Sequence, residues 1–338
     1  MDQYSMPQEG TTVMLNDRKW KIIQQMADGP FSKVFLVEES GKQYAMKVEK
    51  AEGCLRPVLK LDHQVLCNLG SCKGFPSLVS SGRTRGFKYV VMQLLGPDLD
   101  VLLDMMPNRC FSKSTQYKIA LQTLERLQRL HRAGWLNRDV KIHNFAVGMG
   151  ADSSTIYMLD FGLTKKFIDK NRPFLLRGCG PCVGTFPFAP LASGAFKDQT
   201  PADDLEGWLY MMLHLMKGGL PWYNQKNQWD MPTCREWKMY ARTESGKKRL
   251  FEGLEPCWKE IFNMIISTPA YTVPNYEKMA TMIYNTARQT GVNLSDPFDW
   301  QMNQVGRALV GLSPLPTVST TVHTALRSRL DTVCTAVG

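Results

Sequence analysis

The stretch Leu136-Asn-Arg-Asp-Val-Lys-Ile-His-Asn-Phe145, together with Asp160-Phe-Gly162 further along, decides the fold of this 338-residue chain. The first stretch contains an aspartate, Asp139, which is followed by a lysine after two residues and by an asparagine after five. The second motif begins sixteen residues after that asparagine and adds a second carboxylate. Two carboxylates, an amide and an ammonium are the groups that phosphoryl transfer from a magnesium nucleotide requires, because the protein contributes mainly positioning and charge neutralisation. The spacing therefore predicts a phosphoryl-transfer site in one cleft.

A third motif lies upstream, in a segment that alternates like a strand. Tyr44-Ala-Met-Lys47 places a lysine where it can hold the α- and β-phosphates of a nucleotide. Taken alone, an Asp-Phe-Gly tripeptide is an ordinary turn, and a lysine on a strand is ordinarily a solvated edge residue. The three motifs, however, stand in the order and spacing of the protein-kinase lysine, catalytic loop and metal-binding turn. Their coincidence predicts a protein kinase fold.

The hydrophobic pattern divides the chain into a β-rich part and a helical part. Residues 20–49 predict a three-stranded antiparallel meander, and residues 57–70 predict one amphipathic helix. Residues 89–94 predict a further strand, after which a long buried helix is expected between Ser112 and Gly134. We therefore expect an α+β, bilobal protein kinase fold, with a small antiparallel β lobe that carries one main helix and a large, mostly α-helical lobe. The predicted domains are an N-terminal extension (1–16), the small lobe (17–94), the large lobe (95–301) and a Ser/Thr-rich C-terminal tail (302–338).

Composition and charge exclude several other classes of protein. Apolar residues make up 43% of the chain, enough for a large core, but the longest uncharged stretches are too short for a membrane span. The nine cysteines are an odd number without regular spacing, and the N-terminus lacks the features of a secretory signal. We therefore expect reduced thiols and a cytoplasmic location, with the nucleus as an alternative. The net charge of +10 comes from dispersed Lys and Arg, which form no platform for nucleic acid and are compatible with an acidic protein substrate. The oligomeric state stays open.

Seven stretches of the chain carry a resemblance to a known family. They are Tyr44-Ala-Met-Lys-Val-Glu49, Val90-Val-Met-Gln-Leu-Leu-Gly-Pro-Asp-Leu99, Asn144-Phe-Ala146, Tyr157-Met-Leu-Asp-Phe-Gly-Leu163, Asp203-Asp-Leu205, Leu220-Pro-Trp222 and Asp296-Pro-Phe-Asp-Trp300. Through them the chain resembles the casein kinase 1 superfamily, and within it the tau-tubulin kinase-like branch, over about residues 17–301. The resemblance implies an ATP- and Mg²⁺-dependent protein serine/threonine kinase that transfers the γ-phosphate to serine and threonine hydroxyls, with a role in signalling. It further implies a protein substrate that is acidic or primed by phosphate.

The resemblance also implies a role for each matched residue of the motifs. Asp139 is expected to be the catalytic base that accepts the proton of the substrate hydroxyl, and Lys141 to neutralise the transferring phosphate. Asn144 and Asp160 are the expected Mg²⁺ ligands, whose hard oxygen atoms suit a metal that also binds nucleotide phosphates. Thr185 is expected to hydrogen-bond the catalytic aspartate and lysine.

The resemblance implies a nucleotide site made of a phosphate-binding loop, the strand lysine with its helix partner, and an adenine-binding hinge. Met92 takes the gatekeeper position, and residues 93–95 take the hinge. The expected nucleotide-site residues are Ala27, Gly29, Ser32, Val34, Ala45, Lys47, Asp62, Met92, Gln93 and Leu95. Asp204 matches the buried aspartate that braces the backbone of the catalytic loop.

Three features of the nucleotide site and the catalytic loop depart from the family pattern. The phosphate-binding loop, Ala27-Asp-Gly-Pro-Phe-Ser-Lys-Val34, keeps one glycine of three, and its proline removes an N–H from the tip, so weaker nucleotide binding is expected. Asp62 stands where the family has a glutamate, and Asn137 replaces the histidine of the His-Arg-Asp motif. These departures motivate an alternative, in which the chain is a catalytically weak or inactive pseudokinase that acts as a scaffold.

The segment after residue 178 departs most. Pro187 stands where casein kinases 1 carry an arginine that helps to bind a phosphate-primed substrate, so that preference stays open. Cys179-Gly-Pro-Cys182 has the sequence of a thioredoxin site but lies in a predicted loop, and one such pair cannot close a zinc site. A reversible disulfide at this pair stays an alternative. A second alternative is that the Ser and Thr residues of the tail are autophosphorylated and that the tail folds back on the basic cleft.

Overall fold

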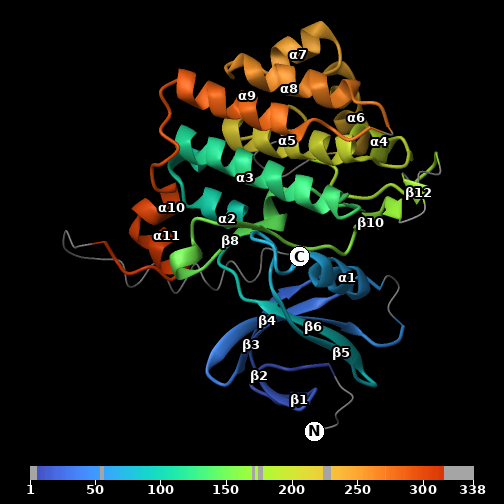
Figure 1. The fold of residues 1–338 in the computed structure, drawn as a ribbon, viewed down its shortest axis with the longest axis vertical. Helices are drawn as coiled ribbons and strands as arrows, with labels where there is room; N and C mark the ends of the chain where they lie inside the picture. Colours follow the sequence, from blue (N-terminus) through green and yellow to red (C-terminus); the bar gives the residue numbers. More distant parts are fainter. Residues whose placement is uncertain are drawn as a thin grey trace.

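The structure of the protein is a computed structural model, and it describes residues 6–53, 57–169, 172–173, 178–223, 230–270 and 272–315. Figure 1 shows an N-terminal part built around one sheet and a mostly helical C-terminal part, with α1 (Leu59–Leu69) at the border between the two. This arrangement confirms the predicted α+β, bilobal fold with a small antiparallel β lobe and a large helical lobe.

The small lobe is built on a six-stranded sheet whose neighbouring strands are all antiparallel, in the order β1-β2-β3-β4-β6-β5. The strands are β1 (Thr12–Leu15), β2 (Arg18–Asp28), β3 (Lys33–Glu39), β4 (Lys42–Lys50), β5 (Leu78–Arg83) and β6 (Phe87–Gln93). The predicted meander is present as β2, β3 and β4. The hydrophobic pattern missed β1, which lies in the predicted N-terminal extension, and β5. Both are edge strands whose side chains are mostly not buried, so their alternation is weak.

The strand register divides the side chains of the sheet between two faces. One face, which includes the fully buried Trp20, forms a small apolar core of its own. On the other face Val34 lies opposite Lys47, and Ala45 lies opposite Met92. Lys47 contacts residues of α1 and of the large lobe, so this second face looks toward the rest of the molecule.

Glu49 of β4 fixes the start of α1. Its Oε2 accepts hydrogen bonds from the backbone N–H groups of Val58 (2.9 Å) and Leu59 (3.0 Å), and its Oε1 lies 2.8 Å from Nζ of Lys88. The first N–H groups of a helix have no partner within the helix, so a buried carboxylate both satisfies them and meets the positive end of the helix. The start of the predicted helix is therefore held against β4, the strand that also carries Lys47.

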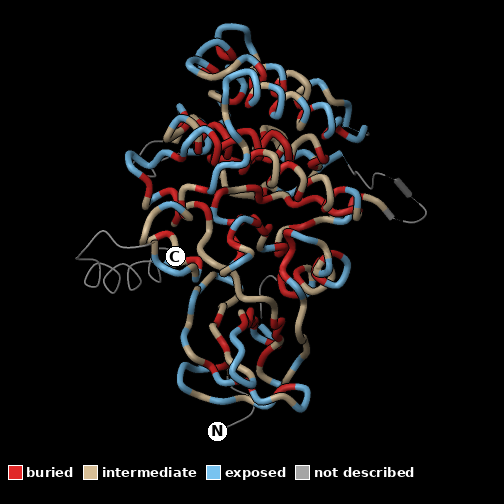
Figure 2. Tube along the Cα trace, turned by 60° about the vertical axis from the view of Figure 1, so that its left-hand side comes forward, coloured by how far each residue is buried: buried red, intermediate tan, exposed pale blue. Residues whose placement is uncertain are grey.

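The large lobe packs around one extensive apolar core, and Figure 2 shows its buried residues gathered between the helices. Its helices are α2 (Leu99–Asp104), α3 (Lys113–Arg132), α4 (Leu191–Gly194), α5 (Pro201–Lys217), α6 (Met231–Tyr240), α7 (Glu244–Leu250), α8 (Pro256–Ser267), α9 (Tyr276–Gln289), α10 (Asp299–Met302) and α11 (Gln304–Leu309). Short strands join them: β7 (Trp135–Leu136), β8 (Phe145–Val147), β9 (Ile156–Met158), β10 (Lys165–Lys166), β11 (Ile168–Asp169) and β12 (Arg172–Pro173). The predicted long helix is α3, and its N-cap is Ser112, whose Oγ accepts a hydrogen bond from the N–H of Thr115 (3.3 Å).

The described part of the predicted tail is attached to the large lobe. The N–H of Gly150 donates to the carbonyl of Val310 (2.7 Å), and the side chain of Gln304 bonds both backbone groups of Leu315. Residues 316–338, which hold most of the Ser and Thr residues of the predicted tail and thus the proposed autophosphorylation sites, lie outside the described residues. Within the described ranges, no helix has the length and apolarity that crossing a membrane requires.

Candidate active site

Lys47 lies on β4 with its ammonium between two carboxylates. Its Nζ is 2.8 Å from Oδ2 of Asp62 on α1 and 3.0 Å from Oδ1 of Asp160. Lys47 is 8% exposed and Asp62 is 2% exposed, so this ion pair is withdrawn from water. The structure thus brings together the lysine of the strand motif, the helix aspartate and the first residue of the Asp-Phe-Gly motif.

The charges of these three side chains depend on one another. Burial opposes the charge of Lys47, but the carboxylates of Asp160 and Asp62 outweigh burial and raise the pKa of the lysine. Lys47 in turn holds the pKa of Asp160 below its ordinary value. Burial raises the pKa of Asp62, against the opposing effect of Lys47. The lysine is therefore charged at physiological pH, and the ionised form of Asp62 depends on it.

Asp62 also fixes the Asp-Phe-Gly turn. Its second oxygen, Oδ1, accepts a hydrogen bond from the N–H of Phe161 (2.9 Å), and Oδ1 of Asp160 accepts one from the N–H of Gly162 (3.2 Å). Asp160 has φ = 55°, in the left-handed region, which a residue with a side chain adopts at a cost unless local bonds support it. The ring of Phe161 stacks on Phe75, with centroids 6.1 Å apart. The turn is thereby held with Asp160 toward Lys47 and with Phe161 in the core.

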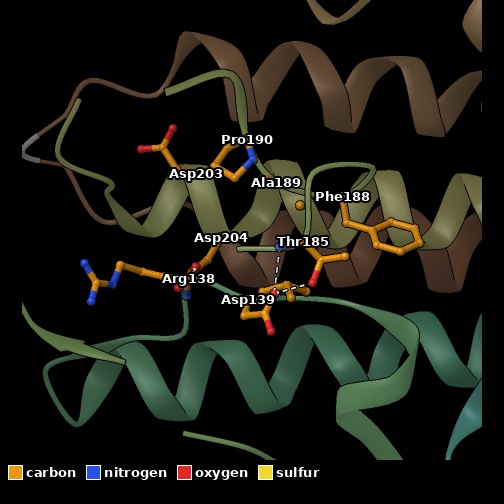
Figure 3. A pocket seen from close by; sticks show the side chains of 10 residues that line it. Arg138, Asp139, Thr185, Phe188, Ala189, Pro190, Asp203 and Asp204 are labelled. Carbon is orange, nitrogen blue, oxygen red and sulfur yellow. Dashed lines mark hydrogen bonds between the residues drawn. The ribbon is translucent and has the colours of Figure 1, made fainter. Parts of the chain in front are cut away.

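Asp139 lies in the loop after β7, and both of its carboxylate oxygens have donors. Oδ1 accepts hydrogen bonds from the N–H (2.9 Å) and the hydroxyl (2.8 Å) of Thr185, the two dashed bonds of Figure 3. Oδ2 lies 3.1 Å from Nζ of Lys141 and 3.3 Å from Nδ2 of Asn144. Of the two partners expected for Thr185, the structure shows bonds to Asp139, while Lys141 binds the other oxygen of the same carboxylate. The residues predicted for the catalytic loop therefore meet Thr185 in one cluster.

Asp204, near the start of α5, braces the backbone before Asp139. Its carboxylate accepts hydrogen bonds from the N–H groups of Asn137 (2.6 Å) and Arg138 (2.7 Å), and Nε2 of His131 lies 2.8 Å from its Oδ2. Asn137 continues this bracing, because its Oδ1 accepts a hydrogen bond from the N–H of Asp139 (3.0 Å). The sequence analysis missed this role. An Asn that bonds the N–H two residues later is a common turn arrangement, and that local pattern was the available signal.

The predicted phosphate-binding loop is the hairpin between β2 and β3. Ala27 pairs with Val34 across the hairpin, and Val34 pairs with Lys47 on β4. At the tip, the N–H of Gly29 donates to the carbonyl of Ser32 (2.9 Å). The hairpin therefore forms without the two missing glycines, in the same row of the sheet as Lys47.

The predicted hinge follows the next strand. Ala45 of β4 pairs with Met92 of β6, beside the row that contains Lys47. Gln93 ends β6, and its Nε2 lies 3.4 Å from the hydroxyl of Tyr157. Leu95 follows in the connection to α2. The residues predicted for adenine thus adjoin the row of the sheet that carries the lysine.

Asp160 and Asn144 present the oxygen atoms expected of a Mg²⁺ site. The side chain of Asp160 remains 49% exposed beside Lys47. Nδ2 of Asn144 donates to the carbonyl of Asp139 (2.8 Å), so the amide oxygen points away from that carbonyl. Carboxylate and amide oxygens are the donors that Mg²⁺ accepts alongside water and nucleotide phosphates. Among the described residues, no group of three or more His, Cys, Asp or Glu side chains is arranged to hold a metal ion.

The Cys-Gly-Pro-Cys sequence does not form a thioredoxin-like site. Cys179 is exposed, Cys182 is partly buried, and both thiols are free, as are the other five cysteines of the described ranges. The segment is neither the end of a strand nor the start of a helix, which a redox site of that type requires. Instead, the N–H of Val183, next to Cys182, donates to Oγ of the buried Ser193 (3.1 Å).

No protein-family model matches the chain. The chain is similar to the serine/threonine-protein kinase spe-6 of Caenorhabditis elegans, with 41% identity over 308 residues that cover 90% of this chain and 81% of that protein. It is also similar to a probable serine/threonine-protein kinase of Dictyostelium discoideum, with 30% identity over 290 residues that cover 84% of this chain and 57% of that protein.

Proposed function

The chain belongs to the serine/threonine protein kinases, and we propose that it transfers the γ-phosphate of ATP, with Mg²⁺, to serine and threonine hydroxyls of protein substrates. Within that family we propose a casein kinase 1-like enzyme that acts in signalling. The observation that carries the assignment of residues is the arrangement around Asp139. Thr185 occupies one carboxylate oxygen, while the other oxygen lies beside Lys141.

We assign Asp139 as the catalytic base. The two bonds from Thr185 to Oδ1 fix the orientation of the carboxylate, so that Oδ2 is the atom proposed to accept the proton of the substrate hydroxyl. Lys141 lies 3.1 Å from Oδ2 and is proposed to neutralise charge on the transferring phosphoryl group. The base is thus proposed to act on the substrate hydroxyl and the cation on the neighbouring phosphoryl group, and the single residue between Asp139 and Lys141 keeps the two groups close together.

Asp160 and Asn144 are proposed to hold the Mg²⁺ that accompanies ATP, which supplies neutralisation of the phosphate charge. Lys47 is proposed to hold the α- and β-phosphates. In the structure Asp160 and Asp62 share its ammonium. Because Asp62 also holds the N–H of Phe161, it would keep Lys47 and the Asp-Phe-Gly turn together if Asp160 held Mg²⁺.

The alternative of an inactive scaffold gains no support. Both relatives are named as kinases. The phosphate-binding hairpin forms despite its missing glycines, and Asp62 reaches Lys47 although it is shorter than the family glutamate. The substitutions that motivated the scaffold alternative therefore leave the expected contacts in place.

We further propose an acidic protein substrate and a location in the cytoplasm or nucleus. The net charge of +10 supports the first proposal, and the irregular set of nine cysteines supports the second. Pro187 in place of the family arginine argues against a strong requirement for a phosphate-primed site. The rates of phosphorylation of paired acidic peptides, with and without a phosphoserine, measure the requirement for priming.

Transfer of labelled γ-phosphate from MgATP to casein, and to an acidic peptide library, tests the activity. Asp139→Asn is the matched blank, because it keeps the size of the side chain and removes the base. We expect the variant to lose about a hundredfold to ten-thousandfold in rate. Equal incorporation by the wild type and by the folded variant would contradict the assignment of Asp139.

A further inference from the structure

The loop Phe186–Ala189 follows Thr185 directly, and a buried lysine binds it from α6. Nζ of Lys238 donates hydrogen bonds to the carbonyl of Phe186 (2.6 Å) and to the carbonyl of Ala189 (2.7 Å). Lys238 is 3% exposed, so its ammonium is committed to these bonds rather than to water. Two carbonyls three residues apart are thereby held at one atom.

The same loop has two further attachments. Nε1 of Trp222 donates to the carbonyl of Pro187 (2.8 Å). Inside the loop, the N–H groups of Phe188 (2.9 Å) and Ala189 (2.8 Å) both donate to the carbonyl of Thr185. Since the N–H and hydroxyl of Thr185 hold Asp139, the loop and the carboxylate form one connected unit.

The surroundings of Lys238 indicate that its ammonium interacts mainly with the carbonyls of the loop. Among the described residues no carboxylate forms a salt bridge with its Nζ, which instead lies 5.3 Å from the ring centre of Tyr210 and 5.5 Å from that of Trp222. Burying an ammonium without a carboxylate partner costs free energy, and here carbonyl dipoles and ring faces provide the compensation. A methionine would fill the same space without that cost, so the lysine contributes something other than packing.

We propose that Lys238 is a positioning residue that clamps the Phe186–Ala189 loop against Asp139 and thereby sets the affinity for the protein substrate. This rests on the proposed kinase activity. Figure 3 shows that Phe188, Ala189 and Pro190 line a small pocket together with Thr185 and Asp139. Because this loop is bonded through Thr185 to the proposed base, a change in the loop is expected to alter how the protein substrate is held next to Asp139. The Lys47 side of the site, where ATP is proposed to bind, is expected to stay unchanged.

The clamp also predicts a pH dependence. Burial lowers the pKa of Lys238 to about 8. The nearby Arg242 also lowers this pKa, whereas Cys234 and Glu206 raise it. Tyr210, the other titratable group that faces the ammonium, stays neutral because burial raises its pKa. As pH rises through 8, the ammonium becomes a neutral amine, and its two hydrogen bonds lose their charge assistance.

The first experiment measures kcat, KM for casein and KM for ATP in the wild type, Lys238→Met and Lys238→Arg. Lys238→Met is expected to raise KM for casein about tenfold, with KM for ATP unchanged. The wild-type KM for casein is expected to rise several-fold from pH 7 to pH 9, while Lys238→Arg, which keeps its charge over this range, stays flat. Equal changes in both KM values would overturn the clamp.

The second experiment is hydrogen exchange followed by mass spectrometry, which needs no kinase activity. In Lys238→Met the amides of Phe188 and Ala189 are expected to exchange about tenfold faster, with those of α3 unchanged. Faster exchange in a chain without activity would support the clamp and reject the proposed function. Unchanged exchange in a chain with kinase activity would reject the clamp and support the proposed function. If Lys238→Met does not fold, the same amides are compared between pH 7 and pH 9 in the wild type and in Lys238→Arg, with rates corrected for intrinsic exchange. The clamp predicts faster exchange at pH 9 in the wild type alone.

Discussion

Asp62 and Lys47 form a buried ion pair, with Oδ2 of Asp62 2.8 Å from Nζ of Lys47, and the same aspartate holds the N–H of Phe161 through Oδ1. One short side chain thus ties α1 to β4 and to the Asp-Phe-Gly turn. The family glutamate is one methylene longer, so an aspartate makes this contact only with α1 close to the sheet. Glu49, which receives the first N–H groups of α1 from the same strand, supports that close position.

Asp62→Asn is expected to weaken both activity and stability. The variant leaves the ammonium of Lys47 with Asp160 as its one carboxylate, so Asp160 is less free to bind a metal. We expect kcat/KM for ATP to fall at least about tenfold, and the free energy of unfolding to fall by about 3 kcal/mol, as for other buried pairs that lose one partner. Steady-state kinetics and urea unfolding measure the two effects.

Asp17→Asn is the control for that change. Asp17 is exposed in the turn between β1 and β2 and has φ = 59°, a conformation that asparagine also tolerates. The Asp17→Asn variant removes one negative charge far from Lys47 and Asp160, and we expect its kcat/KM for ATP and its free energy of unfolding to equal those of the wild type. An Asp62→Asn variant that matched this control in both measurements would show that the ion pair carries no function.

The hydroxyl of Thr185 is expected to contribute to the rate and not to ATP binding. Thr185→Val keeps the shape of the side chain and the backbone N–H bond to Asp139 but removes the 2.8 Å hydroxyl bond. A hydrogen bond to a charged group contributes about 1.5 to 3 kcal/mol, so kcat is expected to fall about tenfold to a hundredfold. Thr185→Ser keeps the hydroxyl and is expected to stay within a few-fold of the wild type. Equal rates for the valine and serine variants would remove the hydroxyl from the mechanism.

Local motifs predicted what depends on nearby residues, and missed what depends on distant ones. The strand lysine, the helix before Gly70 and the N-cap Ser112 follow from spacing and capping within a few residues. The contact of Lys238 with the carbonyls of Phe186 and Ala189 joins segments about fifty residues apart, through backbone atoms that every residue has. No residue type marks such an acceptor, so neither composition nor spacing could indicate the clamp. Only the packing of α6 against the loop reveals it.

His214 is expected to make the large lobe sensitive to acid. Its ring is buried on α5 between Phe188 and Tyr223, with ring centres 5.6 Å and 5.5 Å away. Burial lowers its pKa to about 4, from an ordinary value near 6.5 that the unfolded chain keeps. Between these two values the unfolded state binds more protons than the folded state, so stability falls as pH falls from 6.5 to 4.

The size of that effect follows from the two pKa values. At pH 4 it amounts to about 3 kcal/mol, since each unit of pKa difference corresponds to about 1.4 kcal/mol. His214→Phe keeps an aromatic ring and cannot be protonated. Urea unfolding at pH 7 and at pH 4 is expected to show a smaller loss for this variant than for the wild type, by about that amount. A parallel loss in both chains would place the acid sensitivity elsewhere.

Asn137 is expected to be required as an amide, although the family carries a histidine at this position. Its Oδ1 accepts the N–H of Asp139, and its own N–H is held by Asp204, so it links the brace to the proposed base. Asn137→Ala leaves the buried N–H of Asp139 without a partner, which is expected to cost about 1 to 3 kcal/mol of stability and about tenfold in kcat. Asn137→His restores the family residue, but an imidazole does not have an oxygen at the position of Oδ1, and we expect it to lower kcat as well. Values of kcat with casein for the wild type, Asn137→Ala and Asn137→His distinguish an amide that is required from one that is only tolerated. If the histidine variant equals or exceeds the wild type, the asparagine is a tolerated substitution; if both variants fall together, the amide has taken over the positioning of Asp139 in this chain.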